Sequence, residues 1–276
     1  MNKGNGTISF PGLGIGEFNI DNVAFKIGDF EIYWYAVLIA TGFVLAVLLG
    51  LYLAKKKAIK QDDVLDGIIW ITPVSVICAR LYYVIFDPNG SYNSIKEIFA
   101  IRDGGMAIYG AVIGAFVCAV IHCKIKKISI LDVADIVAPC FLVGQIVGRW
   151  GNFVNQEAFG GETTLPWGMQ LIINGKETIV HPTFLYESLW NLGGLIILLS
   201  LFKHSRKYKG IIFGGYLIWY GMGRFFIEQL RTDQLKILSV PVSVLVSGIA
   251  VIIGITSVVC IIKNVNKKGE EYGEDN

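Results

Sequence analysis

Long hydrophobic runs, each nearly free of charge, alternate along the chain with short polar segments. The first run, residues 32–54, contains no charged residue, and as a helix it can cross a hydrocarbon core of roughly 30 Å. Six further runs are comparable, although the second and sixth contain an internal arginine and the fourth begins with two aspartates. The pattern predicts seven membrane-spanning helices, at 32–54, 66–86, 105–123, 132–148, 185–202, 210–230 and 238–262.

The polar segments between the runs differ in basic content, and this difference predicts an orientation. Lysine and arginine crowd the segments 55–60, 124–127, 203–209 and 263–268, whereas the other connections are sparse in them. Basic loops remain on the cytoplasmic side of a membrane. Seven spans place all four basic segments on that side, so we expect the N-terminus outside and the C-terminus in the cytoplasm.

The longest connection, residues 149–184, then falls on the outer side. It contains two β-favouring runs around Asn174-Gly175, a pair typical of tight hairpin turns. The sequence therefore predicts an all-α polytopic membrane protein with seven transmembrane helices and a small extracytoplasmic head that contains a β-hairpin. We expect an extracytoplasmic N-terminal arm over 1–31, a seven-span domain over 32–262, and a disordered cytoplasmic tail over 263–276.

Composition supports the membrane class and argues against others. Of the 276 residues, 54% are hydrophobic and 17% are charged, whereas soluble domains carry about 25% charged residues. We find no basic stripe suited to nucleic acid. The five cysteines lie in or beside apolar runs, without a spacing that suits zinc or a disulfide framework. We expect no nucleic-acid partner, no metal and no cofactor.

Polar side chains recur every three or four residues along the sixth run, on one helical face. An arginine within a span costs at least about 2.5–3.5 kcal/mol on insertion scales, so it must face protein or water and needs a partner. One interpretation is a structural ion pair between Arg224 and Glu228. The other is that the arginines bind an anionic ligand such as a phosphate. The stripe comprises Tyr216, Tyr220, Arg224, Glu228 and Arg231.

Three further polar residues allow both a structural and a functional interpretation. Arg80, in the second run, could be neutralised by Asp132 or Asp135 within the bundle. Tyr109 is either a tyrosine of the membrane-interface belt or part of a site. His181 directly precedes a proline at the predicted start of the fifth helix, where it either caps the helix or binds a ligand.

Polar residues from several separate segments map to one depth, the outer half of the bilayer or just above it. Randomly scattered polar groups would not share a depth, so we predict one site that is open to the outer leaflet and holds a lipid head group. A transporter or binding protein for an anionic solute, and another phospholipid-modifying enzyme, remain alternatives, although no inverted repeat is evident. The residues are Tyr35, Tyr109, Arg149, Asn152, Glu157, His181, Tyr220, Arg224, Glu228 and Arg231.

The stretch GRWGNFVNQEAFGG, residues 148–161, resembles the signature G-R-x-G-N-F-x-N-x-E-x-x-G of the prolipoprotein diacylglyceryl transferases. The segments YWYAVL, DGGMAIYG, DIVAP, HPTFLYE and YGMGRFFIEQLR are similar to further blocks of that family, in the same order. The resemblance implies a seven-span enzyme of the bacterial inner membrane. Such an enzyme moves the diacylglyceryl group of phosphatidylglycerol to the lipobox cysteine thiol of a prolipoprotein, which forms a thioether and releases glycerol phosphate.

The resemblance also implies roles for individual residues. The essential arginine and asparagine of the signature match Arg149 and Asn152. We hypothesise that Asn152 and Tyr35 position oxygens, and that Glu157 orients Arg149 or Asn155. The remaining matched positions are Gly160, Tyr220, Arg224, Glu228 and Arg231.

The chemistry requires a thiolate nucleophile and stabilisation of the charge that grows on the leaving phosphate. We assign the stabilisation to Arg149 and Arg224, and the steering of anionic lipid to Arg231. One position departs from the family pattern, because Tyr109 stands where some members carry a histidine assigned as the base. Tyrosine is a poor base near neutral pH. Tyr109 could hydrogen-bond the phosphate, while another group or the lipid phosphate takes the thiol proton.

Overall fold

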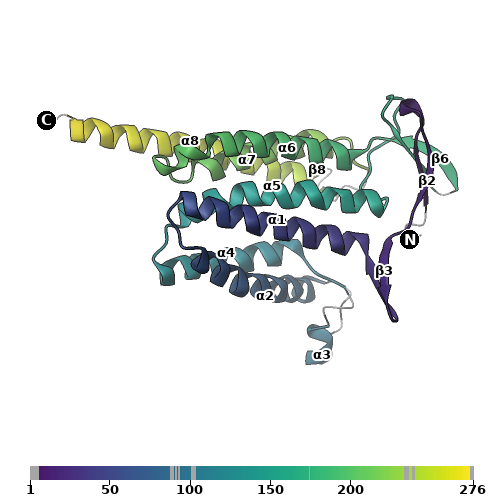
Figure 1. Ribbon diagram of the computed structural model, residues 1–276, viewed down its shortest axis with the longest axis horizontal. Helices are drawn as coiled ribbons and strands as arrows, with labels where there is room; N and C mark the ends of the chain where they lie inside the picture. Colours follow the sequence, from purple (N-terminus) through teal and green to yellow (C-terminus); the bar gives the residue numbers. More distant parts are fainter. Residues whose placement is uncertain are drawn as a thin grey trace. The chain divides into compact units, whose positions relative to one another are not determined.

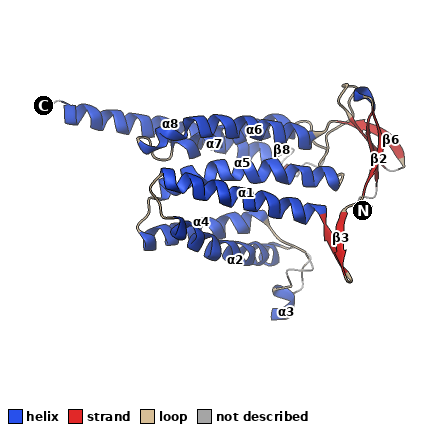
Figure 2. Cartoon of the chain, in the orientation of Figure 1, coloured by secondary structure: helices blue, strands red, loops and turns tan. Residues whose placement is uncertain are grey.

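The computed structural model describes residues 6–87, 90, 92, 94–100, 104–173, 175–232, 236–237 and 240–273. Its described parts form two compact units. The first comprises Met1–Leu49 and Ala134–Asn276, and the second comprises Gly50–Val133. Both units are mainly helical, and strands occur in the first (Figure 2).

Within the described residues, seven helices have 18 or more residues, and each lies close to a predicted span. Six of them are long and apolar enough to cross a membrane, which confirms a mostly helical, polytopic membrane protein. The exception is α7, an 18-residue helix that contains Arg224 and Glu228. The seven are α1 (Trp34–Lys56), α2 (Gln61–Phe86), α4 (Ile108–Lys126), α5 (Ile130–Val154), α6 (Thr183–Leu201), α7 (Ile211–Glu228) and α8 (Val242–Gly273).

The shorter elements lie between the long helices and in the N-terminal region. A short helix α3 (Ile95–Ile98) follows α2, and the 3-10 turns η1 (Pro11–Leu13) and η3 (Phe202–Arg206) follow β1 and α6. The strands are β1 (Gly6–Phe10), β2 (Ile15–Ile20), β3 (Val23–Ile27), β4 (Phe30–Tyr33), β5 (Met169–Ile173), β6 (Lys176–Val180), β7 (Lys236–Ile237) and β8 (Val240–Pro241).

A four-stranded antiparallel sheet, in the order β2-β1-β5-β6, joins the N-terminal region to the long connection between α5 and α6. Strands β5 and β6 form a hairpin around Gly175, which has a φ of +77° that glycine adopts without strain. Asn174, the other residue of the predicted turn, lies outside the described residues. The sequence patterns predicted no strand in the N-terminal arm, so β1 and β2 are an addition to the expected hairpin.

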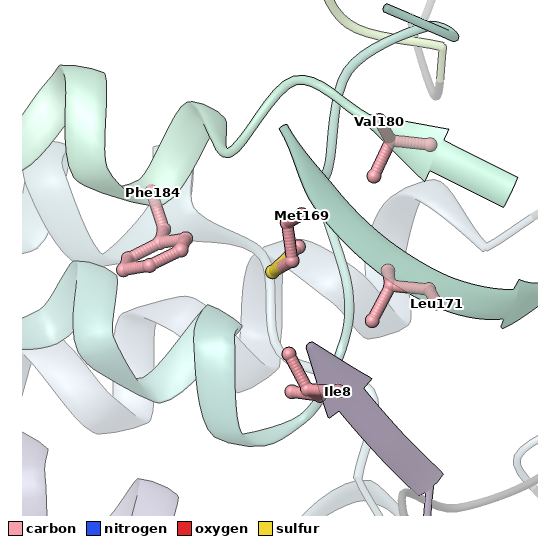
Figure 3. Close-up of a cluster of buried hydrophobic side chains, with 5 residues drawn as sticks. All are labelled: Ile8, Met169, Leu171, Val180 and Phe184. Atoms are coloured by element: carbon pink, nitrogen blue, oxygen red, sulfur yellow. The ribbon is translucent and has the colours of Figure 1, made fainter. Parts of the chain in front are cut away.

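The sheet is fixed to the helices by a small apolar core (Figure 3). Ile8 of β1 packs with residues of β5 and β6, and Phe184 of α6 extends the cluster to the first turn of that helix. This contact positions the start of α6 beside the connection that carries the signature sequence. The core residues are Ile8, Met169, Leu171, Val180 and Phe184.

Asp135, near the start of α5, fixes the beginning of α7. Its carboxylate is fully buried and accepts hydrogen bonds from the backbone N–H groups of Gly210 (2.8 Å), Ile212 (2.9 Å) and Phe213 (3.1 Å). The first N–H groups of a helix have no partner within the helix, so a carboxylate there is stabilising. Helices α6, α7 and α8 pack alongside one another in the same unit (Figure 1).

In the second unit, Arg80 of α2 is buried and binds backbone oxygens of a single segment. Its Nε donates to the carbonyl of Ile98 (2.8 Å), and Nη2 donates to that of Glu97 (2.8 Å). Its Nη1 donates to the carbonyls of Gly104 (2.7 Å) and Gly105 (3.0 Å). Arg80 therefore holds the segment that leads into α4.

The predicted neutralisation of Arg80 by an aspartate is wrong. Asp132 lies 2.8 Å from Lys57 Nζ, and the carboxylate of Asp135 is occupied at the start of α7. Four carbonyl dipoles directed at one guanidinium replace the carboxylate that the pattern suggested, because an arginine can be satisfied by neutral acceptors.

Candidate functional site

Three helices of the first unit bring charged side chains together at one place. Arg149 lies near the end of α5, Glu187 in the first half of α6, and Arg224 in the last turns of α7. Arg149 Nη2 lies 2.6 Å from Glu187 Oε2, and Arg224 Nη1 lies 3.2 Å from Glu187 Oε1. One carboxylate thus bridges two guanidinium groups that the sequence assigned to a common site.

Two more charged residues complete this Arg–Glu cluster. Arg224 Nη2 lies 2.6 Å from Glu228 Oε2, four residues along the same helix. Arg231 Nη1 lies 3.9 Å from Glu187 Oε1, at the edge of the ion-pair range. The structural ion pair of Arg224 and Glu228 is therefore present, and it is part of a larger cluster. The cluster comprises Arg149, Glu187, Arg224, Glu228 and Arg231.

The carboxylates of the cluster are more deeply buried than its guanidinium groups. The side chains of Glu228 and Glu187 are 3% and 8% exposed, whereas those of Arg224 and Arg149 are 16% and 23% exposed. An anion that approaches the cluster therefore meets guanidinium groups first. Because the buried charges are paired, the cluster can exist without a ligand at a tolerable desolvation cost.

A second set of polar contacts holds Arg149 from the side of the signature segment. Asn152 Oδ1 accepts a hydrogen bond from Arg149 Nη1 at 3.2 Å. Glu157 Oε1 accepts hydrogen bonds from the side-chain amides of Asn152 (3.0 Å) and Asn155 (3.3 Å). Glu157 contacts Asn155 directly and reaches Arg149 through Asn152, and its orienting role stays a prediction.

Gly160 allows a close backbone contact between the signature segment and the end of α7. It pairs with Arg231 in an isolated β-bridge, its N–H donates to the carbonyl of His181 (3.0 Å), and Gly161 N–H donates to that of Leu230 (2.8 Å). A Cβ atom at Gly160 would lie 2.7 Å from His181 Cβ and 2.8 Å from Leu230 O. Only glycine fits this position without displacing backbone.

His181 lies beside Gly160, but its ring faces another partner. Its Nδ1 lies 3.2 Å from Tyr186 Oη, and Tyr186 accepts a hydrogen bond from Trp167 Nε1 at 2.8 Å. Pro182 occupies the N-cap of α6, and no side chain caps this helix. The predicted capping by His181 is wrong, and its carbonyl instead ties Gly160 to the start of α6.

Two aromatic residues of the predicted site, Tyr35 and Tyr220, lie on α1 and α7. The rings of Tyr216 and Tyr220 are stacked with centroids 5.7 Å apart, and Tyr220 is one turn before Arg224. Tyr35 packs against Gly151, where an added Cβ would lie 2.6 Å from the tyrosine ring. Tyr35 is thus beside the residue that precedes Asn152.

Tyr109 belongs to the second unit, where it lies in the first turn of α4. Its side chain is half-exposed, and its ring centroid is 6.4 Å from that of Tyr82. The membership of Tyr109 in the site stays a prediction.

Glu187 is absent from the predicted site, yet it contacts all three arginines of the cluster. A signal for it exists, because it is an acidic residue inside an apolar run, five positions after the proline of the His-Pro pair. An acidic residue within a span needs a cationic partner for the same reason that an arginine does. Its partners come from two other helices and a loop, which spacing along α6 does not indicate.

Fold and site together define a class: a polytopic helical membrane protein with a buried cluster of arginines and carboxylates. The chain belongs to the prolipoprotein diacylglyceryl transferase family, whose sequence profile matches residues 22–260.

Curated relatives from several bacteria cover most of the chain. A protein of Clostridium perfringens named phosphatidylglycerol–prolipoprotein diacylglyceryl transferase 1 is 44% identical over 255 residues, 89% of this chain and 96% of the relative. Proteins named phosphatidylglycerol–prolipoprotein diacylglyceryl transferase are 45% identical in Lysinibacillus sphaericus and 44% identical in Clostridioides difficile. These matches cover 87% and 91% of this chain, and 92% and 100% of the relatives.

Proposed function

We propose that this chain transfers the diacylglyceryl group of phosphatidylglycerol to the lipobox cysteine thiol of a prolipoprotein. The observation that carries the proposal is the bridging of Arg149 and Arg224 by one buried carboxylate, with the guanidinium groups on the more exposed side. Two guanidinium groups held by one carboxylate can also bind the oxygens of a phosphate. The names of the relatives supply the lipid and the protein substrate.

The proposed topology has seven spans in a bacterial inner membrane, with α7 added to the six candidate spans. The charges of α7 are compatible with a span because Arg224 has carboxylate partners on both α6 and α7. The density of lysine and arginine in 55–60, 124–127, 203–209 and 263–268 favours an extracytoplasmic N-terminus and a cytoplasmic C-terminus. The four-stranded sheet and the Arg–Glu cluster then lie on the outer side of the membrane.

In the proposed reaction, the cysteine thiolate attacks the glyceryl carbon that carries the phosphate. The new S–C bond is the thioether, and the C–O bond breaks with its electron pair on the departing glycerol phosphate. The phosphate changes from a diester with one negative charge to a monoester with two. Arg149 and Arg224 stabilise this added charge, because fixed donors in a water-poor site need no reorganisation.

Glu187 acts in this scheme as a positioning residue. Its two oxygens contact different guanidinium groups, at 2.6 Å and 3.2 Å, so it fixes the distance between Arg149 and Arg224. A guanidinium carries five N–H donors, so it can bind a carboxylate and a phosphate together. Glu157, acting through Asn152, restrains Arg149 at its other terminal nitrogen, Nη1.

The remaining predicted residues have supporting roles in the proposal. Asn152 and Tyr35 orient lipid oxygens. Gly160 sets the backbone contact that holds Arg231 beside the cluster. The proposed substrate-binding residues are Tyr35, Arg149, Asn152, Gly160, His181, Tyr220, Glu228 and Arg231.

A reconstituted assay tests the function. The full chain is placed in phosphatidylglycerol vesicles with a lipobox peptide, and the peptide mass and released glycerol phosphate are measured. We expect a diacylglyceryl mass increase, which Arg149→Ala lowers by about 10²–10³-fold, the range for loss of a group that stabilises developing charge. Lys176→Ala, an exposed change on β6, is the control.

Three outcomes would contradict the proposal. An unmodified peptide together with solute flux would indicate a transporter. A modified lipid with an unmodified peptide would indicate another phospholipid enzyme. Transfer by Arg149→Ala at the rate of Lys176→Ala would remove Arg149 from the chemistry.

A further inference from the structure

The hairpin of β3 and β4 is a two-stranded ribbon separate from the four-stranded sheet. Beyond the irregularity near its base, its cross-strand pairs are Phe25 with Ile32, Lys26 with Glu31, and Ile27 with Phe30. Directly opposite residues share one face of an antiparallel pair, and neighbours along a strand alternate between faces. The ribbon therefore has one apolar face and one polar face.

The polar face is satisfied within the ribbon itself. Lys26 Nζ lies 2.7 Å from Glu31 Oε1, and Tyr33 Oη donates to Glu31 Oε2 at 3.1 Å. This contact with the lysine and the tyrosine hydroxyl lowers the pKa of the Glu31 carboxyl, so the face carries a paired charge at neutral pH.

The apolar face is exposed. Phe25, Ile27 and Phe30 are 50%, 63% and 73% exposed, so the exposure of this face rises toward the tip of the ribbon. An isolated two-stranded hairpin is marginally stable in water, and a cluster of exposed apolar groups marks a contact surface. This face therefore requires a covering partner.

The position of the ribbon identifies that partner. Strand β4 ends at Tyr33 and α1 begins at Trp34, whose backbone N–H donates to Asn22 O at 2.9 Å. This bond fixes the base of the ribbon to the first residue of an apolar helix long enough to span a membrane. Figure 1 shows the ribbon running across the direction of α1, hence along the surface of a membrane that α1 crosses.

We propose that the apolar face of the β3–β4 ribbon lies in the bilayer interface and contacts phospholipid. Phe25, Ile27 and Phe30 enter the boundary between head groups and acyl chains, while the Lys26–Glu31 pair stays in water. The exposed side chain of Trp34, a residue type that prefers the interface, joins the ribbon to the lipid-facing surface of α1. This continuity favours lipid over a bound peptide or a second copy of the chain.

Photo-crosslinking on the full chain tests the proposal. Benzoylphenylalanine replaces Phe30 on the apolar face or, as the matched control, Lys26 on the polar face. Each variant is irradiated in phosphatidylglycerol nanodiscs with a lipobox peptide present, and adducts are identified by mass. We expect several-fold more phospholipid adduct at position 30 than at position 26. The pair Ile27 and Glu31 repeats the comparison if either first variant is poorly folded.

Three results would overturn the proposal: equal lipid labelling of the two faces, adducts at position 30 that contain the peptide, or adducts that contain a second chain. Diacylglyceryl transfer by the same samples reports on the proposed function separately, because the ribbon contributes no residue to the Arg–Glu cluster. A failed lipid contact with normal transfer would reject only the membrane contact.

Discussion

The two units both bury arginines in apolar helices, but they satisfy them differently. In the second unit, Arg80 donates to four backbone carbonyls of one connecting segment. In the first unit, Arg149 and Arg224 share the carboxylate of Glu187 and remain partly exposed. The acceptors of Arg80 are therefore neutral carbonyls, whereas the acceptor of Arg149 and Arg224 is a charged carboxylate.

The difference separates a structural arginine from a binding one. Arg80 is buried, and backbone carbonyls accept four hydrogen bonds from its five N–H donors, which leaves little capacity for a ligand. A guanidinium paired with a carboxylate keeps donors for an incoming anion, and the pairing keeps the empty site near neutrality. The partners of an arginine within a span are therefore a better indicator of its function than its burial.

Exchanging Arg149 for lysine should lower activity, whereas exchanging Arg80 for lysine should lower stability. Lysine lacks the planar fork that serves two partners. Arg149→Lys should lower kcat/KM for diacylglyceryl transfer by about 10²-fold with an unchanged melting temperature. Arg80→Lys should lower the melting temperature by several degrees, because carbonyls near the start of α4 lose their donor.

Vesicle assays and thermal unfolding in nanodiscs check this pair of variants. A melting temperature that falls for Arg149→Lys and is unchanged for Arg80→Lys would reverse the assignment of the two regions.

Removing the charge that links the arginines should have a smaller effect on the rate. Glu187→Gln keeps the side-chain shape but weakens the hold on Arg149 and Arg224, so we expect kcat to fall by about 10–10²-fold. The buried arginines also lose compensation, which lowers the melting temperature. Glu187→Asp, which restores the charge on a shorter side chain, should recover stability more than rate.

The control is Glu177→Gln on β6, an exposed carboxylate outside the cluster. If Glu187→Gln transferred lipid at the rate of this control, Glu187 would not position the arginines.

The smallest expected effect is on kcat/KM when Tyr109 of the second unit is changed. It tests whether a residue of that unit takes part in the reaction. Tyr109→Phe removes only a hydroxyl from a half-exposed side chain, so stability should be unchanged. If the hydroxyl binds the phosphate, loss of one hydrogen bond to a charged group lowers kcat/KM by about tenfold. Steady-state kinetics on phosphatidylglycerol vesicles measure the change. If Tyr109→Phe has the same kcat/KM as the parent chain, the contribution of Tyr109 is limited to packing.

The long helices could be predicted from the sequence because their cause is local. A charge-free run of span length must satisfy its own backbone, and only a helix does so within one segment. The strands β1 and β2 depend on a distant partner, since Ser9 pairs with Gln170 of β5. Short alternation in the N-terminal arm does not indicate that pairing, so the four-stranded sheet was missed.

The site shows the same division between local and distant causes. Arg149, Asn152 and Glu157 lie within one short signature and contact one another as a chain of hydrogen bonds. The role of Glu187 depends on three segments that meet only in the fold. The predicted partners of Arg80 are wrong because its acceptors are backbone carbonyls. Every residue has a backbone carbonyl, so the sequence does not indicate which of them accept hydrogen bonds.

The carboxylate of Asp135 at the start of α7 has a consequence for how this protein can change over time. Helix α5 meets α7 at one end through Asp135, and at the other end Arg149 and Arg224 share a single acceptor. One residue inserted between Asp135 and Arg149 would turn Arg149 by about 100° about the helix axis. Lipid-facing residues between these two points can be exchanged without moving either contact, whereas a change in their number would separate the two contacts.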